Sequence, residues 1–296
     1  MPPAVRVGVD TLCWHLRLER GAVTVADVLA EAVELGAETV GVNLHHLRHA
    51  DLEAHRELAR HAEASGLALI ASGDFVGAAR HGDRPEEGVE RVAGWVARAA
   101  ALGSPYCRLA SGFYRAELAG RPDLIEAERR HVVEVLRGAL PQADHAGVTL
   151  LLENHSDFTA DEYVRIVEEV GEGRIGVFLD VINPMAALED PLPVIARLAP
   201  LARAGHVKDY ELVSIQTDDA YHRRGFEVRY RYPGEGVADL PGLVRALLAA
   251  LPDREYHLTV EGLDNHADVD DQRRRLAPAL ALLRRLIAEE QPVPTV

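Results

Sequence analysis

Residues 148–180 read VTLLLENHSDFTADEYVRIVEEVGEGRIGVFLD and contain one complete unit of the architecture that we predict. Two apolar runs, 148–153 and 175–180, are rich in Val, Leu and Ile, which is typical of strands covered on both faces. Between them, Thr159 and Glu162 have the spacing of a capping box at the start of an amphipathic segment. The pattern therefore predicts a parallel strand–helix–strand unit.

The same alternation of apolar runs and amphipathic segments extends over the whole chain. Strands are predicted at 5–10, 38–43, 67–72, 106–111, 148–153, 175–180, 204–209 and 257–262. Helices are predicted at 24–36, 51–65, 86–102, 123–146, 160–171, 191–202, 239–251 and 269–289. Because each of eight strands is followed by a helix, we predict the α/β class and a (β/α)8 TIM barrel, with 1–296 as a single domain.

The alternative fold is an open, doubly wound sheet. No G-x-G-x-x-G motif follows the first strand, and no change in composition marks a second domain, so the barrel is favoured. The longest connection runs from His206 to Glu261 and includes YHRRGFEVRYRYPGEG at 221–236. We expect a loop there that covers a site or meets a partner.

Composition limits the possible partners. The 296 residues include 32 Lys and Arg against 47 Asp and Glu, a formal charge of -15, which excludes nucleic acid and anionic membranes as expected partners. No segment of about 18 apolar residues or secretory leader is visible, so we expect a soluble, cytoplasmic protein. Cys13 and Cys107 form no motif and are expected to be buried and reduced.

Four polar residues close the last four predicted strands: Glu153, Asp180, His206 and Glu261. A single residue of this kind is often a helix cap or a solvated loop residue. Four in succession, however, are expected to meet, because barrel sites lie at the carboxyl ends of the strands. Three carboxylates and one imidazole favour one divalent metal, Mn²⁺ first, with Mg²⁺ or Co²⁺ as alternatives.

Several segments of the chain resemble one known superfamily. They are LLLENH, GVFLDVINP, GHVKDY, PGEGVADL and LTVEG, and they are similar to those of the sugar phosphate isomerase/epimerase superfamily, the xylose isomerase-like barrels. The resemblance follows the strand order of the whole chain and is strongest from 148 to 262. It implies that the four strand-ending residues hold one divalent metal, commonly Mn²⁺. It also implies an H-x-K-D element at 206–209 and assembly into dimers or tetramers.

Residues beside the predicted ligands are candidates for catalysis and substrate binding. Lys208 shares a strand face with His206, so it can stabilise an oxyanion or bind a substrate hydroxyl. A salt bridge from Lys208 to Asp209 or Glu235 is the competing interpretation. His155 either contacts substrate, orients a ligand or makes a loop hydrogen bond.

Further substrate contacts are predicted in the loops. Trp14 and His15 follow the first strand and can supply a stacking surface and a polar contact, or can pack beneath the loop. Asn183 stands where several epimerases and dehydratases of the superfamily have histidine, so it either holds a hydroxyl or fixes a turn with Pro184. Weaker candidates, otherwise solvated, are Arg229, Arg231, His45 and His46.

The predicted reaction follows from these ligands. A metal that binds a carbonyl and its neighbouring hydroxyl favours a cis-enediolate, with Glu153 and Glu261 as the acid/base pair. The first expectation is a sugar isomerase or epimerase acting on a small carbohydrate. The alternative is a lyase, either a dehydratase or a deglycosylase of 3-oxo-glycosides, which would allow a second kind of subunit.

Two other functional classes share parts of this pattern. A DNA-repair endonuclease shares the barrel that the chain resembles but needs more histidine ligands and a basic groove, which the charge opposes. A non-catalytic barrel subunit would not need the four ligands.

Overall fold

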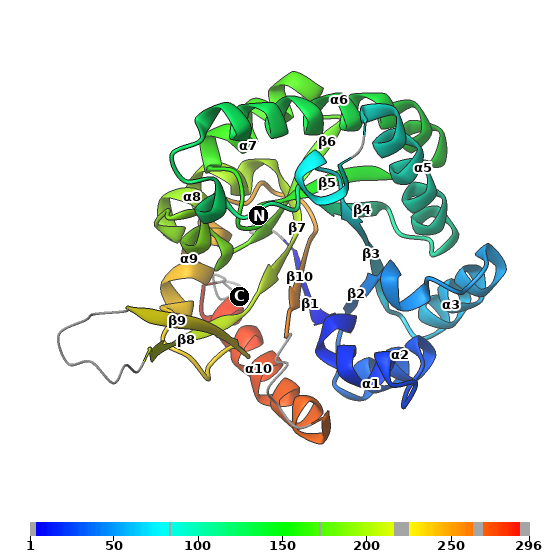
Figure 1. Ribbon diagram of the computed structural model, residues 1–296. Helices are drawn as coiled ribbons and strands as arrows, with labels where there is room; N and C mark the ends of the chain where they lie inside the picture. Colours follow the sequence, from blue (N-terminus) through cyan, green and yellow to red (C-terminus); the bar gives the residue numbers. More distant parts are fainter. Residues whose placement is uncertain (1–3, 83, 172, 216–224, 263–268, 291–296) are drawn as a thin grey trace.

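The computed structural model describes residues 4–82, 84–171, 173–215, 225–262 and 269–290. Eight parallel strands close into a barrel, and each strand pairs with two neighbours (Figure 1). Around the barrel they are β1 (Val5–Asp10), β10 (Tyr256–Val260), β7 (Ala202–Val207), β6 (Ile175–Asp180), β5 (Thr149–Glu153), β4 (Tyr106–Ala110), β3 (Ala68–Phe75) and β2 (Thr39–Asn43). The predicted single-domain (β/α)8 barrel is confirmed.

Helices surround the barrel and lie close to their predicted bounds (Figure 1). At Thr159 the capping box is present, because its side chain accepts the N–H of Glu162 and the Glu162 carboxylate accepts the N–H of Thr159. Among the described helices, none combines the length and apolar character that a bilayer crossing requires. The long helices are α2 (Val25–Glu34), α3 (Leu52–Ala64), α5 (Pro85–Ala101), α6 (Pro122–Ala146), α7 (Ala160–Val170), α8 (Pro191–Leu198), α9 (Leu240–Ala250) and α10 (Val269–Glu290).

Short helical turns occupy several loops at the carboxyl ends of the strands. They redirect the chain at once after β1, β2 and β6, so residues that follow these strands stay near the barrel mouth. The short elements are α1 (His15–Glu19), α4 (Ala78–His81), η1 (Thr11–Trp14), η2 (Leu44–Leu47), η3 (Arg115–Leu118), η4 (Asn183–Ala187) and η5 (Ala199–Leu201).

The long connection after β7 corrects one prediction. Instead of a loop, it contains an antiparallel hairpin of β8 (Asp209–Ser214) and β9 (Phe226–Arg231), which extends away from the barrel (Figure 1). The sequence FEVRYR alternates apolar and charged residues, which favours a strand with two different faces. Residues 221–224 of the segment singled out in the sequence lie outside the described residues.

Two apolar cores support the barrel mouth. The large core lies between the strands and the surrounding helices, and it contains both cysteines, which are buried and unpaired as predicted. The small core lies inside the barrel, where Ile70, Leu151, Phe178 and Ala204 pack together against Tyr106. This inner layer fills the barrel, so polar side chains one step further along the strands lie above an apolar floor.

Candidate metal centre

Three of the four predicted ligands come together at the barrel mouth. The ligand atoms of Glu153, His206 and Glu261 all lie within 4.8 Å of one another. His206 Nδ1 lies 3.3 Å from Glu153 Oε1 and 3.5 Å from Glu261 Oε1. Glu153 and His206 are completely buried, so the stiff ends of β5 and β7 fix their positions.

The fourth predicted ligand, Asp180, borders this group through a lysine. The Nζ atom of Lys208 lies 2.8 Å from Asp180 Oδ2 and also pairs with Glu261. The other oxygen of Asp180 accepts the backbone N–H groups of Ile182 and Asn183, at 2.7 and 2.8 Å. Asp180 is therefore held rigidly, with one oxygen turned towards the centre and a cation between it and Glu261.

Asn154 completes the support of Asp180. Its side-chain amide donates to the Asp180 carbonyl at 2.9 Å, and its side-chain oxygen accepts the Asp180 N–H at 2.7 Å. Asn154 thus bridges the ends of β5 and β6 and has a structural role.

Two residues at the centre were not recognised in the sequence. Asp10 ends β1, and its Oδ2 atom lies 3.3 Å from His206 Nε2. Arg108 projects from β4 and forms an ion pair with Glu153. Asp10 carries the same signal as the predicted ligands, a carboxylate that closes an apolar strand. Arg108 is marked by a charge inside an otherwise apolar run.

Gly41 on β2 makes room for Asp10. A Cβ atom at Gly41 would lie 2.3 Å from Asp10 Oδ2, closer than any side chain tolerates. The glycine therefore lets the Asp10 carboxylate lean over β2 towards His206.

The charges at the centre stabilise one another. Burial alone would raise the pKa of Glu153, but Arg108 and His206 outweigh it and hold that pKa well below its usual range. Against the same effect of burial, Lys208 and His206 lower the pKa of Glu261 to about 2. Burial opposes the charged form of His206, yet Glu261, Asp10 and Glu153 raise its pKa to about 10.

The donor set fits a divalent cation. A carboxylate only accepts hydrogen bonds, so His206 must donate its Nε2–H to Asp10. That leaves Nδ1, the nitrogen that faces the two glutamates, as the metal-binding atom, in the arrangement common for histidine ligands backed by a carboxylate. The structure thus contains a possible metal-binding group, whose ion it does not identify.

Two predicted substrate residues lie near the centre. His155 follows Glu153, and the centroid of its ring lies 6.0 Å from those of the Phe75 and Tyr114 rings. Asn183 is buried in η4, and within the described residues its side-chain Nδ2 atom has no hydrogen-bond partner. Their contacts with substrate stay predictions.

Lys208 takes the inward direction that was predicted, and it does not form the salt bridge to Asp209 or Glu235 that was the competing interpretation. Asp209 instead accepts the backbone N–H groups of Gly234, Gly236 and Ala238, and Glu235 pairs with Arg275. The turn at 233–236 is therefore structural, as its composition indicates. Lys208 remains available to the centre.

For two predicted substrate residues the structure shows other contacts. Trp14 is 1% exposed and donates its indole N–H to Glu31 at 2.7 Å, so it packs beneath the β1 loop and offers no stacking surface. Arg229 pairs with Glu227 on one face of the hairpin. Its neighbour Tyr230 has the opposite orientation and places its ring centroid 4.6 Å from Lys208 Nζ.

The observed contacts of His15 do not include the carboxylates of the centre. Its Nδ1 atom lies 3.1 Å from Nε2 of His46, in the loop after β2. The two histidines follow different strands in the sequence, and the structure brings them together.

Comparisons with known proteins agree with this architecture. Among solved structures, the fold is similar to D-psicose 3-epimerase with D-tagatose from Clostridium cellulolyticum H10, with a TM-score of 0.73 and 15% identity over 95% of this chain and 99% of that one. It is similar to the IOLI protein with a binding zinc atom, with a TM-score of 0.70 and 16% identity over 97% and 100%. It is also similar to the probable 3-DHS dehydratase AsbF from Bacillus anthracis, with a TM-score of 0.65 and 15% identity over 95% and 98%.

At sequence identities of 15–16%, the similarity to these solved structures shows the fold alone. Among proteins with curated functions, no sequence matches this chain significantly. The family model described as "Xylose isomerase-like TIM barrel" matches residues 29–286, which is most of the chain. The chain therefore belongs to the xylose isomerase-like TIM barrel family.

Proposed function

We propose that the protein is a divalent-metal-dependent sugar isomerase or epimerase, with Glu153 and Glu261 as its acid/base pair. The observation that carries this proposal is the pair of carboxylates on either side of His206 Nδ1, at 3.3 and 3.5 Å, in a buried mouth. Structural neighbours that act on D-psicose and L-ribulose support a free carbohydrate as substrate.

The proposed metal ligands are Glu153, Asp180, His206 and Glu261, with Mn²⁺ as the first candidate. A bound divalent cation would polarise a substrate carbonyl and its neighbouring hydroxyl and so lower the cost of an enediolate. The zinc atom in one structural neighbour makes Zn²⁺ the first alternative to test.

The chain's own groups can move the proton. Both glutamates are ionised near neutral pH, because Arg108, Lys208 and His206 lower their pKa values. One carboxylate can therefore remove the proton next to the carbonyl and, now protonated, can return it to the neighbouring carbon. Return to the same carbon from the other side requires the second glutamate first to take up a proton from solvent. Lys208, between Asp180 and Glu261, is placed to hold a substrate oxygen that gains negative charge.

The hairpin favours a second candidate, a lyase that expels a group next to the same enediolate. Tyr230 stands over Lys208, and the residues paired along the same hairpin face include Leu212, Val228 and Phe226, all largely exposed. An apolar surface continuous with the site would suit an aromatic leaving group or a partner subunit. One structural neighbour is a probable dehydratase, which keeps water loss among the candidates.

The test is incubation of the Mn²⁺-loaded protein with ketoses and 3-oxo-glycosides in D₂O, followed by NMR. Deuterium at the carbon next to the carbonyl, without bond loss, supports the isomerase or epimerase, whereas release of water or an aglycone supports the lyase. Glu153→Gln and Glu261→Gln should each abolish turnover and leave the circular dichroism spectrum unchanged. Full activity of Glu261→Gln would show that the two-carboxylate scheme is wrong.

A matched control is Glu134→Gln, which changes an exposed glutamate on α6 and should leave turnover unchanged. No exchange, isomerisation or elimination with any of these substrates, in protein that holds its metal, would favour a non-catalytic barrel.

A further inference from the structure

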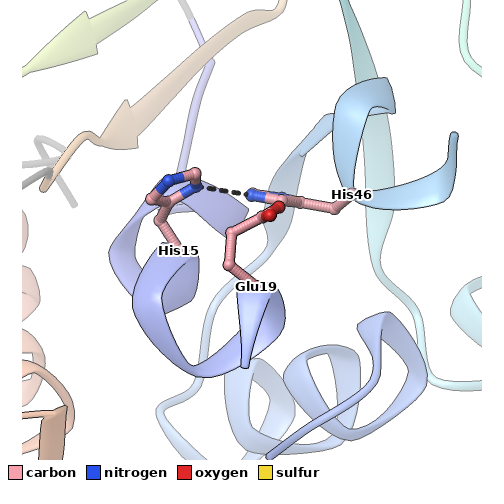
Figure 2. A group of neighbouring side chains, drawn as sticks. All are labelled: His15, Glu19 and His46. Carbon is pink, nitrogen blue, oxygen red and sulfur yellow. Dashed lines mark hydrogen bonds between the residues drawn. The ribbon is translucent and has the colours of Figure 1, made fainter. Parts of the chain in front are cut away.

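A second group of metal-binding side chains lies beside the carboxyl ends of β1 and β2. It consists of His15 and Glu19, the first and last residues of α1, together with His46 in η2 (Figure 2). His15 and Glu19 are four residues apart, so they share one face of the helix. Their ligand atoms and that of His46 all lie within 4.8 Å of one another.

We propose that His15, Glu19 and His46 form a second metal site, selective for zinc and separate from the centre at Glu153, His206 and Glu261. Two imidazoles and one carboxylate are a ligand set that Zn²⁺ accepts readily, with the fourth position left for water or a substrate atom. Ligand atoms about 2.0–2.2 Å from a tetrahedral zinc lie about 3.3–3.6 Å apart. The 3.1 Å between His15 Nδ1 and His46 Nε2 is close to that spacing.

Residues behind His46 orient its ring. Its Nδ1 atom lies 3.1 Å from the hydroxyl of Thr11, which also accepts the backbone N–H of Asn43 at 2.9 Å. A hydrogen bond from Nδ1 to this hydroxyl leaves Nε2 as the atom that faces His15 and Glu19. Support of this kind on the far side of the ring is common for histidine ligands.

The two imidazoles are neutral near pH 7, so each ring has one unprotonated nitrogen. A metal ion can bind that nitrogen without first displacing a proton from it. Burial, with smaller contributions from His15 and His45, lowers the pKa of His46 to about 4. Burial also lowers the pKa of His15, with help from His45 and Arg48. Neutral imidazole is the form that binds zinc.

The carboxylate of Glu19 already contacts Arg48 and His45, so a bound metal ion would share this carboxylate with them. Nη1 and Nη2 of Arg48 lie 3.0 and 3.2 Å from its two oxygens, and His45 Nε2 lies 3.3 Å from Oε1. Arg48 is therefore expected to weaken zinc binding, and its removal should strengthen it.

The two centres are neighbours along the chain. Thr11, which holds His46, follows Asp10, which holds His206. The proposed zinc would therefore sit on the rim of the same mouth. The proposal does not depend on the reaction proposed above, and it can fail while that reaction stands.

The experiment counts zinc in the full chain after chelation, using equilibrium dialysis against Zn²⁺ and elemental analysis. Wild type should bind two ions per chain, and the double variant Glu153→Gln/Glu261→Gln should bind one. Adding His15→Ala and His46→Ala to that double variant should remove the remaining ion. His49→Ala, an exposed histidine three residues from His46, is the matched control and should leave the count unchanged.

Cobalt gives a second measurement that reports ligand identity. Co²⁺ in the double glutamine variant should show the visible absorption of a four-coordinate site, and Arg48→Ala in that background should bind Zn²⁺ several-fold more tightly. If the double glutamine variant binds no zinc, or if the histidine variants keep the ion, the contact is only a hydrogen-bonded pair of histidines. If Arg48→Ala leaves the affinity unchanged or weaker, Glu19 is not a ligand and the three-residue site is overturned.

Discussion

At the scale of single residues, Asp10 and His206 show how one contact prepares a metal ligand. Because Asp10 accepts from Nε2, the imidazole must present Nδ1 to Glu153 and Glu261. Asp10 also accepts the backbone N–H of Leu12 through its other oxygen, at 2.8 Å, so its carboxylate cannot turn away. The orientation of the imidazole is thus built into the start of the chain, far in sequence from the other ligands.

Asp10→Asn should weaken metal binding by about 10–100-fold. The asparagine oxygen can keep the Leu12 N–H, which would direct the amide NH₂ group at His206 Nε2 and favour the wrong tautomer. The affinity can be measured by competition with a chelator for Mn²⁺. Asp74→Asn, an exposed residue at the end of β3, is the control and should bind Mn²⁺ as wild type does.

The contributions of Glu261 and His206 to the free energy of unfolding of the metal-free protein should be greatest between pH 4.5 and 6.5. The pKa of Glu261 is depressed from 4.5 to about 2, so its contribution is present above pH 4.5 and lost as the pH falls towards 2. The pKa of His206 is raised from 6.5 to about 10, so its contribution is complete below pH 6.5 and lost as the pH rises towards 10.

Free energies of unfolding across this pH range check both directions. Glu261→Gln should flatten the acid side, whereas Mn²⁺ should reverse the loss on the alkaline side because it takes the place of the proton on Nδ1. A chelated protein that becomes more stable from pH 7 to 9 would contradict this assignment.

The strand-ending residues of the proposed centre could be predicted from the sequence, and several other residues could not. Glu153 and His206 close apolar strands, and a parallel barrel brings such positions together whatever the details of packing. The role of Trp14 could not be decided from the sequence, because burial under a loop depends on the later chain at Glu31. Asp10 was not predicted although it closes an apolar strand in the same way, because it lies far in sequence from the other ligands and only closure of the barrel brings it to them.

At the scale of elements, the β8–β9 hairpin shows where sequence patterns are weakest. Barrel strands are predicted well because an apolar run covered on both faces has few alternatives. The hairpin is half exposed, and apolar and charged residues alternate over only the six positions of β9 and the first four of β8. The arginines of this segment favoured the prediction of a loop. In the structure, the register from Asp209 to Arg231 keeps the two faces of the hairpin distinct.

Asp209→Ala should destabilise the fold by about 3 kcal/mol, because its buried carboxylate holds three backbone N–H groups of the turn after β9. The loss should also disturb the site, since Lys208 is the chain neighbour of Asp209 and Tyr230 lies shortly before the turn. Denaturant unfolding gives the free energy, and Asp209→Asn, which keeps one accepting oxygen, should lie between the variant and wild type. Equal stability of all three proteins would show that the turn is held by other contacts.

At the scale of the whole molecule, barrel closure does what no local pattern can show. β1 pairs with β10 and β10 pairs with β7, so Asp10 and His206 become neighbours across 196 positions of sequence. The order of strands could be predicted, since consecutive parallel strands in a barrel lie side by side. The partners across the mouth could not, because they depend on the tilt of the closed barrel.

Metal binding should stabilise the whole barrel, because its proposed ligands come from four strands. At a free Mn²⁺ concentration of a hundred times the dissociation constant, the gain should be about 2.7 kcal/mol, seen as a rise of several degrees in Tm. Glu153→Gln/Glu261→Gln should show almost no rise. An equal rise in that double variant would place the stabilising ion elsewhere.

The cations already present around Glu153, Asp180 and Glu261 have a consequence for how the protein matures. Arg108, Lys208 and the imidazolium of His206 balance the three acids from within, so the chain can complete its fold before any ion arrives. Assembly and loading then become separate events, and the ion that ends up in the mouth is chosen by what the surroundings offer a finished barrel.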